Sequence, residues 1–80
     1  MSRFSVKLQN NKEFIYGFDH ALGYFYEIWD YNLSKNPDHC LVEDKSRFFD
    51  KLSKNDMTGT MSKFGAHPSH IELVALDLPF

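Results

Sequence analysis

Cysteine is almost missing from this sequence of 80 residues, in which Cys40 stands alone. A disulfide within the chain is therefore impossible, which disfavours a cysteine-stapled secreted fold and favours a reducing cytoplasm. Long apolar runs are missing as well: none approaches the roughly 20 residues of a membrane helix, and the first residues lack the apolar core of a signal peptide. We therefore expect a cytoplasmic protein that makes no contact with membranes.

Charge of one sign is not in excess either. Nine lysine and arginine residues accompany eleven aspartate and glutamate residues, for a formal net charge of −2 at pH 7, and the two signs are interspersed. Proteins that bind nucleic acid usually carry a basic face or stripe. Nucleic acid is thus a disfavoured partner, and a nucleic-acid-binding regulator stays an alternative that would require a basic groove.

The length predicts a single small domain over residues 1–80. A domain of this size buries only about 60% of the surface that its unfolded chain exposes, so its own core supplies modest stability. A partner protein or a second copy of the chain would add to that stability.

Aromatic residues are what the sequence has in abundance. Seven of the thirteen lie in residues 16–31, including the only tryptophan, Trp29. From Tyr24 onward the composition fits the half-buried surface of a pleated sheet. We predict that residues 24–31 form the central strand of a small antiparallel sheet, with aromatic side chains on both faces.

Alternating apolar and polar residues predict two earlier strands, at residues 3–8 and 13–18. Residues 9–12 would form the turn between them, because asparagine tolerates the left-handed backbone of tight hairpins. Residues 19–23 predict a loop or a bulged corner. A short fourth strand at residues 39–43 would lie at a sheet edge.

The stretch after this strand, residues 44–51, mixes both signs of charge, which is typical of a solvated face. Phe48 and Phe49 are adjacent within it. We expect one of them to cover the rim of the core while the other faces a groove or a partner.

Two short helices are predicted after residue 52. The first has Ser53 as its N-cap with Asp56 three residues on, and it would end at Gly65. Its buried face consists of Met57, Met61 and Phe64. The second would open at Pro68 and be ended by Pro79. Its buried face would consist of Ile71, Val74, Ala75 and Leu78. A strand over residues 68–78 remains the alternative.

Together these elements predict an α+β fold, a four-stranded antiparallel β-meander with two short C-terminal helices packed on one face. The strand at residues 24–31 presents different side chains on its two faces. One face carries Tyr24, Tyr26, Ile28 and Asp30, and the other carries Phe25, Glu27, Trp29 and Tyr31. We assign Phe25 and Trp29 to the face under the helices.

The aromatic residues exceed what one sheet face can hide beneath two short helices, so we predict that the second face binds a partner. Tyrosine and tryptophan are enriched in interface hot spots. The partner would be another protein or a second copy of the chain in a homodimer. The predicted contact residues are Tyr16, Tyr24 and Tyr26 as anchors, Glu27 and Asp30 for polar selectivity, and Tyr31. The alternative is a tyrosine-rich core whose hydroxyls reach water at its edge.

An enzyme or a metal-binding protein is the alternative from another class. Its candidate residues are His20, His39, His67 and His70, whose spacing matches no standard zinc pattern. Asp19 beside His20 could form an acid–base pair, but we favour an Asp19 that closes a turn by accepting backbone hydrogen bonds. Cys40 is expected to be a small buried hydrophobic residue. We predict no catalytic residue, no metal site and no cofactor.

The motif Tyr-Gly-Phe-Asp-His-Ala-Leu-Gly-Tyr-Phe of residues 16–25 and the ending Leu-Asp-Leu-Pro-Phe resemble small bacterial proteins that are carried on plasmids, phages and integrated elements. The resemblance transfers no site residue and no agreed activity. It implies an accessory or inhibitory protein of a mobile element, of the kind that anti-CRISPR and toxin-neutralising proteins represent.

Overall fold

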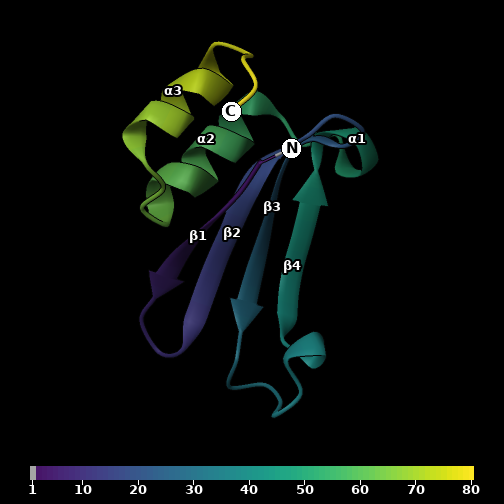
Figure 1. Cartoon of the computed structure of the whole chain (residues 1–80), viewed down its shortest axis with the longest axis vertical. Coiled ribbons are helices and arrows are strands. Elements are labelled where there is room, and N and C mark those ends of the chain that lie inside the picture. The colour runs from purple at the N-terminus through teal and green to yellow at the C-terminus, as the bar shows by residue number, and fades with distance from the viewer. Residues whose placement is uncertain (1) are drawn as a thin grey trace.

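Four strands in chain order build one sheet (Figure 1). The computed structural model describes residues 2–80 and pairs each strand antiparallel with the next, which confirms the predicted meander. The strands are β1 (Ser2–Leu8), β2 (Lys12–Asp19), β3 (Gly23–Asp30) and β4 (Leu41–Ser46). The helical segments are η1 (Pro37–His39), α1 (Arg47–Asp50), α2 (Lys54–Lys63) and α3 (Pro68–Ala75).

Local turn chemistry forms both hairpins at the start of the chain. Asn10 and Asn11, in the three-residue turn between Leu8 and Lys12, have φ angles of 61° and 59°, a left-handed backbone that asparagine tolerates. In the β2–β3 turn, Oδ1 of Asp19 accepts hydrogen bonds from the backbone N–H groups of Ala21 at 2.7 Å and Leu22 at 3.2 Å. The turn-closing interpretation of Asp19 is thereby confirmed. The ladder between β2 and β3 is unbroken, so this stretch is a turn rather than a bulged corner.

β4 begins two residues later than predicted and runs three residues further. The single turn η1 occupies residues 37–39, where the Asn36 side chain accepts a hydrogen bond from Asp38 N at 3.1 Å. β4 then continues to Ser46 as an edge strand. Its register against β3 shifts at Val42, which forms a bulge. Cys40, just before β4, is buried as predicted.

Helices α1 and α2 both begin at a serine cap. Ser46 Oγ accepts a hydrogen bond from Phe49 N at 3.1 Å, and Ser53 Oγ accepts one from Asp56 N at 3.1 Å. These bonds satisfy N–H groups that the first turn of a helix leaves free. The predicted N-cap of α2 is confirmed, and Gly65, with a φ of 80°, follows its end as predicted.

Residues 68–75 form a helix rather than the alternative strand. α3 opens at Pro68 as predicted, but it ends well before Pro79. Asp77 adopts a left-handed φ of 59°, and Leu78 N donates a hydrogen bond to Leu73 O at 2.9 Å. This arrangement closes a helix through its last free carbonyl groups.

The core lies between the sheet and helices α2 and α3. Met57 and Met61 on α2 are completely buried, as predicted. On α3, Val74 is buried, whereas Ala75, the last residue of the helix, is exposed. Leu78 lies beyond the early end of α3 and is also exposed, so that part of the predicted buried face is wrong. The buried core consists of Phe14, Tyr16, Tyr24, Tyr26, Leu52, Met57, Met61, Ala66 and Val74.

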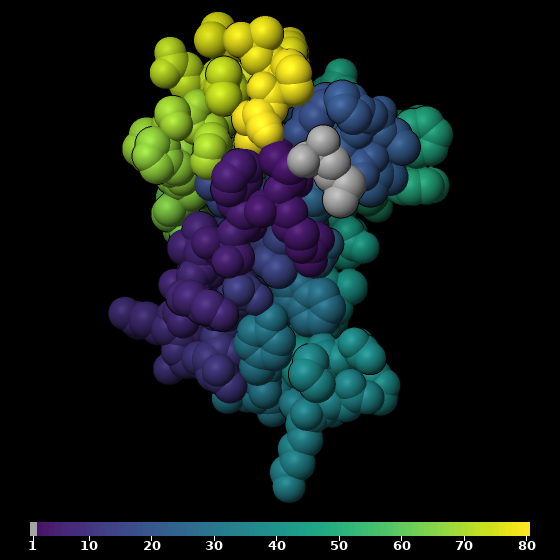
Figure 2. All heavy atoms as spheres, in the orientation of Figure 1, coloured from purple at the N-terminus to yellow at the C-terminus, as the bar shows by residue number. Residues whose placement is uncertain are grey.

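Helices and strands are unevenly distributed along the molecule, whose extents are 38 × 24 × 19 Å. Figures 1 and 2 show α2 and α3 gathered at one end, while strand ends, loops and the single turn η1 form the other. The longest helix, α2, has ten residues, and none of the helices in residues 2–80 combines the length and apolar character needed to cross a bilayer.

Candidate protein-binding face

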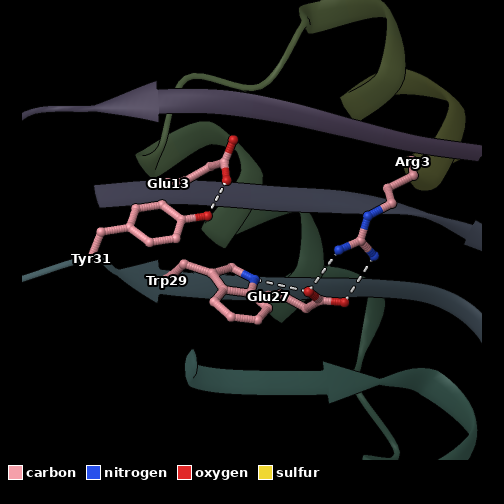
Figure 3. Close-up of polar contacts among 5 residues, drawn as sticks. All are labelled: Arg3, Glu13, Glu27, Trp29 and Tyr31. Atoms are coloured by element: carbon pink, nitrogen blue, oxygen red, sulfur yellow. Dashed lines mark hydrogen bonds and ion pairs between the residues drawn. The ribbon is translucent and has the colours of Figure 1, made fainter. Parts of the chain in front are cut away.

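Cross-strand pairing divides the side chains of the sheet between two faces. Paired residues point to the same face, and neighbours along a strand alternate. Helices α2 and α3 both pack on one face; the other, which we call the open face, has neither of them over it (Figure 3). Three cross-strand rows lie on the open face: Arg3, Gly17, Phe25 and Ser46; Ser5, Ile15, Glu27 and Asp44; Lys7, Glu13, Trp29 and Leu41.

The predicted anchors Tyr16, Tyr24 and Tyr26 lie on the helix-covered face, so the prediction that they point away from the helices is wrong. Their exposed fractions are 2%, 5% and 5%. Phe25 and Trp29, which were expected under the helices, lie on the open face instead. The register is the reason: Tyr24 and Tyr26 pair with aromatic residues of β2 that belong to the core or pack against it.

The three tyrosine hydroxyls explain how such polar rings can be buried. A buried hydroxyl needs a hydrogen-bond partner, and each of these has one inside the protein. The partners are His70 Nδ1 at 2.7 Å for Tyr16, the Leu52 carbonyl at 3.1 Å for Tyr24 and Glu43 Oε1 at 2.7 Å for Tyr26. Burial, followed by the hydrogen bond to Glu43, raises the pKa of Tyr26. The tyrosine-rich core is therefore the correct alternative for these residues.

The other three predicted contact residues separate into two groups. Glu27 and Tyr31 lie on the open face (Figure 3). Asp30 instead closes the turn after β3, where Oδ1 accepts hydrogen bonds from Asn32 N at 3.0 Å and Asn32 Nδ2 at 2.9 Å. The backbone bond first, and then the side-chain bond, lowers the pKa of Asp30.

Arg3 reaches from β1 across β2 to Glu27 on β3 (Figure 3). Its Nη1 and Nη2 atoms each donate to one carboxylate oxygen at 3.0 Å, a bidentate geometry that is among the stronger hydrogen-bonded pairs. Arg3 pairs with Gly17 on β2, where the Phe25 ring fills the space that a side chain would take. Glu27 Oε1 also accepts a hydrogen bond from Trp29 Nε1 at 2.9 Å. One carboxylate thus holds both the guanidinium and the indole.

Tyr31 stacks on Trp29 and extends these side-chain contacts to Glu13. The two rings stack with centroids 6.2 Å apart and planes 15° from parallel. The Tyr31 hydroxyl donates to Glu13 Oε1 at 2.6 Å, and Lys7 Nζ lies 3.2 Å from Glu13 Oε2. The hydrogen bond between Tyr31 and Glu13 lowers the pKa of Glu13 and raises the pKa of Tyr31 to about 12.

These contacts join into one chain of side chains, which we call the polar network: Lys7, Glu13, Tyr31, Trp29, Glu27 and Arg3. Ile15 and Phe25 lie on the same face and are only 8% and 6% exposed, although neither α2 nor α3 covers them. Long polar side chains commonly shield apolar surface in this way. The network therefore offers a guanidinium, an indole and a phenol in fixed positions, which is an arrangement suited to binding.

Sequence reasoning misses Arg3, Glu13 and Trp29 as members of this face. One signal could have found Glu13: β2 alternates large aromatic residues with Glu13, Ile15 and Gly17, so its less apolar side can be recognised from the sequence. Trp29 lacks such a signal, because aromatic residues occupy both sides of β3. The contact between Arg3 and Glu27 has no such signal, because it joins residues 24 positions apart across an intervening strand.

The four histidines do not assemble into one site. His20 and His39 are exposed and lie in separate parts of the chain. His67 and His70 have ring centroids 5.3 Å apart, but His67 caps α3 by accepting a hydrogen bond from the Ser69 N–H. Within residues 2–80 no group of three or more histidine, cysteine, aspartate or glutamate side chains could hold a metal ion.

A second exposed feature is the α1 aromatic pair, Phe48 and Phe49. Their exposed fractions are 68% and 73%, and their rings meet edge to face with centroids 5.0 Å apart. The expectation that one of them covers the core is therefore wrong. α1 is a single turn, capped by Ser46 and ended by Lys51 in a left-handed conformation, and it is too short to bury either ring.

The open face and the α1 aromatic pair are thus two surfaces that residues 2–80 leave available for a partner. No protein-family model, curated protein or solved structure matches the chain.

Proposed function

We propose that the protein is a small binding module that recognises another protein through the open face of its sheet. One observation carries this proposal: Arg3, Trp29 and Tyr31 lie together on that face, each hydrogen-bonded to a carboxylate. Arginine, tryptophan and tyrosine are the residue types most enriched in interface hot spots. Their juxtaposition supports a protein-binding role and no chemical reaction.

Side chains that are already fixed in the free protein lower the entropic cost of association. Binding costs about 0.5–1.5 kcal/mol for each flexible side chain that it immobilises. Arg3 already holds Glu27 through two hydrogen bonds, and Trp29 is both hydrogen-bonded and stacked on Tyr31. A partner would therefore contact large planar groups that have lost much of their side-chain entropy on folding.

The charges of the open face support a partner protein with basic residues over a nucleic acid. The face carries three carboxylates and two cations. Asp44 has no ion-pair partner among residues 2–80, and burial followed by repulsion from Glu27 and Asp50 raises its pKa. A lysine or arginine that a partner places opposite Asp44 would relieve this repulsion.

The first test is the mass in solution, measured by light scattering over a range of concentrations. A monomer would leave the open face for a foreign protein. A dimer that persists on dilution, and that Trp29→Ala dissociates, would make a second copy of the chain the partner. A dimer that Trp29→Ala leaves intact would place the self-contact elsewhere and contradict the proposal for self-association.

The second test compares variants in their binding to a protein captured from cell extract. We expect Trp29→Ala to weaken binding by more than about 1 kcal/mol while the circular dichroism spectrum stays unchanged. The matched control is the double variant Phe48→Ser, Phe49→Ser, which removes the α1 aromatic pair and should bind like the wild type. Loss of binding in the control alone would assign recognition to α1 and overturn the proposal.

We further propose that the protein acts in the cytoplasm as an accessory or inhibitory protein of a bacterial mobile element. The single cysteine and the resemblance of residues 16–25 and 76–80 support this setting. An inhibitor of this kind would act by covering a functional surface of its partner. Loss of inhibition in Trp29→Ala, with normal protein levels in the cell, is the expected result.

A further inference from the structure

A cavity lies on the helix-covered side of the sheet, opposite the open face. It has a volume of about 320 Å³ and opens between the β2–β3 turn, the start of α1 and the end of α3. Pockets for small molecules usually measure about 300–1,000 Å³. The lining residues are Phe18, Gly23, Tyr24, Arg47, Val74, Asp77 and Leu78.

Arg47 is held in a fixed position at this cavity. Its Nη1 atom donates to the Tyr24 hydroxyl at 2.5 Å, and its guanidinium lies 5.4 Å from the centroid of the Tyr24 ring. Gly23 leaves space for the arginine stem, because a Cβ atom at that position would lie 3.1 Å from Arg47 Cβ. Guanidinium has five N–H donors, and this contact uses one of them. Within residues 2–80 the guanidinium has no second hydrogen-bond partner, so the other donors can bind a ligand.

The charge at the cavity is positive where a ligand would approach Arg47. No carboxylate within residues 2–80 forms an ion pair with Arg47. The one acidic side chain of the lining, Asp77, is paired with Lys54 Nζ at 2.9 Å. Lys51 lines a neighbouring hollow together with Arg47 and adds a second cation nearby.

The apolar part of the lining consists of Phe18 on β2 and Leu78 beyond the end of α3, together with the almost completely buried Val74. Apolar surface of this kind favours a ligand that displaces water from it. A ligand that satisfies both parts of the cavity needs an anionic group for Arg47 and a compact apolar body beside it. A carboxylate matches the planar fork of the guanidinium through two parallel hydrogen bonds.

We propose that this cavity binds a small carboxylate with a compact apolar body, such as an arylalkanoic acid. The carboxylate accepts hydrogen bonds from Arg47, and the apolar body covers Phe18 and Leu78. The C-terminal residue of a peptide offers the same chemistry, so both sources belong in the test. The site is independent of the open face, and its failure would leave the proposed protein-binding role unaffected.

The test uses the full chain, labelled with ¹⁵N, and 3-phenylpropionate as the probe. We expect saturable shifts of the amide signals of Gly23, Arg47 and Asp77 in the NMR spectrum. The neutral amide of the same acid should bind about tenfold more weakly, because it lacks the charge that Arg47 pairs with. The corresponding amine should bind weakest. Equal affinity for acid, amide and amine would overturn the proposal without the need for any variant.

Variants assign the interaction to Arg47. Arg47→Gln should weaken binding of the acid about tenfold and leave binding of the amide nearly unchanged. Lys12→Gln, which removes one positive charge far from the cavity, is the matched control and should bind like the wild type. Retention of full affinity in Arg47→Gln, or an equal loss in Lys12→Gln, would contradict the site. A tripeptide that ends in phenylalanine then identifies the source of the carboxylate, with the C-terminally amidated tripeptide as its control. Tighter binding of the free-ended tripeptide than of 3-phenylpropionate would indicate the C-terminus of a protein. Tighter binding of 3-phenylpropionate would indicate a free acid.

Discussion

The hydroxyl of Tyr16 lies 2.7 Å from Nδ1 of His70, and this contact ties the second strand of the sheet to the last helix. Two further rings enclose the imidazole: Phe4 at a centroid distance of 4.3 Å and Phe80 at 5.6 Å. Burial, followed by the nearby charge of His67, lowers the pKa of His70. The folded protein therefore favours the neutral imidazole.

Stability should fall in mild acid because of His70. A histidine whose folded-state pKa is lowered contributes its full stability above the unfolded pKa of about 6.5, and that stability is lost as the pH falls below this value. We expect a lower free energy of unfolding by urea at pH 5.5 than at pH 7.5. His70→Asn should reduce the difference, whereas His20→Asn, at an exposed position, should not. Equal pH dependence in both variants would contradict the assignment.

Gly17 should be intolerant of any side chain. A Cβ atom at this position would lie 2.1 Å from the carbonyl oxygen of Ser2 on the neighbouring strand, so β1 would have to move. We expect Gly17→Ala to lower the free energy of unfolding by about 1–3 kcal/mol. Gly59→Ala is the matched control, because a Cβ there meets nothing within 4 Å and lies in helix α2. The control should raise stability by up to about 1 kcal/mol.

Local signals predicted the elements of this fold well, because each depends on residues close in sequence. The asparagine pair at residues 10–11, the cap at Ser53 and the helix start at Pro68 all act within one turn of backbone. The end of α3 was missed for a related reason. Asp77 adopts a left-handed conformation that aspartate tolerates but that nothing in the adjacent residues requires.

The orientation of β3 could not be predicted in the same way. Aromatic residues occupy both faces of this strand, so alternation alone cannot show which face the helices cover. The answer comes from long-range pairing, because Tyr26 lies opposite Tyr16 and shares its place in the core. The open face depends on that orientation. Residues that sequence reasoning placed under the helices, such as Trp29, therefore became the candidates for binding.

Tyr31 should ionise at unusually high pH. Its hydrogen bond to Glu13 raises its pKa to about 12, whereas an unperturbed tyrosine ionises near pH 10. A group with a raised folded-state pKa contributes stability below its unfolded pKa and loses it as the pH rises, so the protein should weaken between about pH 10 and 12. Absorbance titration of the phenolate is the measurement. Glu13→Gln should move one transition towards pH 10, and an unchanged titration would show that this hydrogen bond does not control Tyr31.

The contact between Arg3 and Glu27 should matter more for binding than for folding. The Arg3 side chain is 48% exposed, so water screens the pair, and pairs of this kind contribute about 0.2–1 kcal/mol to stability. A double-mutant cycle with Arg3→Gln and Glu27→Gln in urea unfolding should give a coupling energy within that range. The same cycle on Lys54 and Asp77, an exposed pair with one contact at 2.9 Å, is the comparison and should give a smaller coupling. A coupling well above that range for Arg3 and Glu27 would assign the pair to the stability of the sheet.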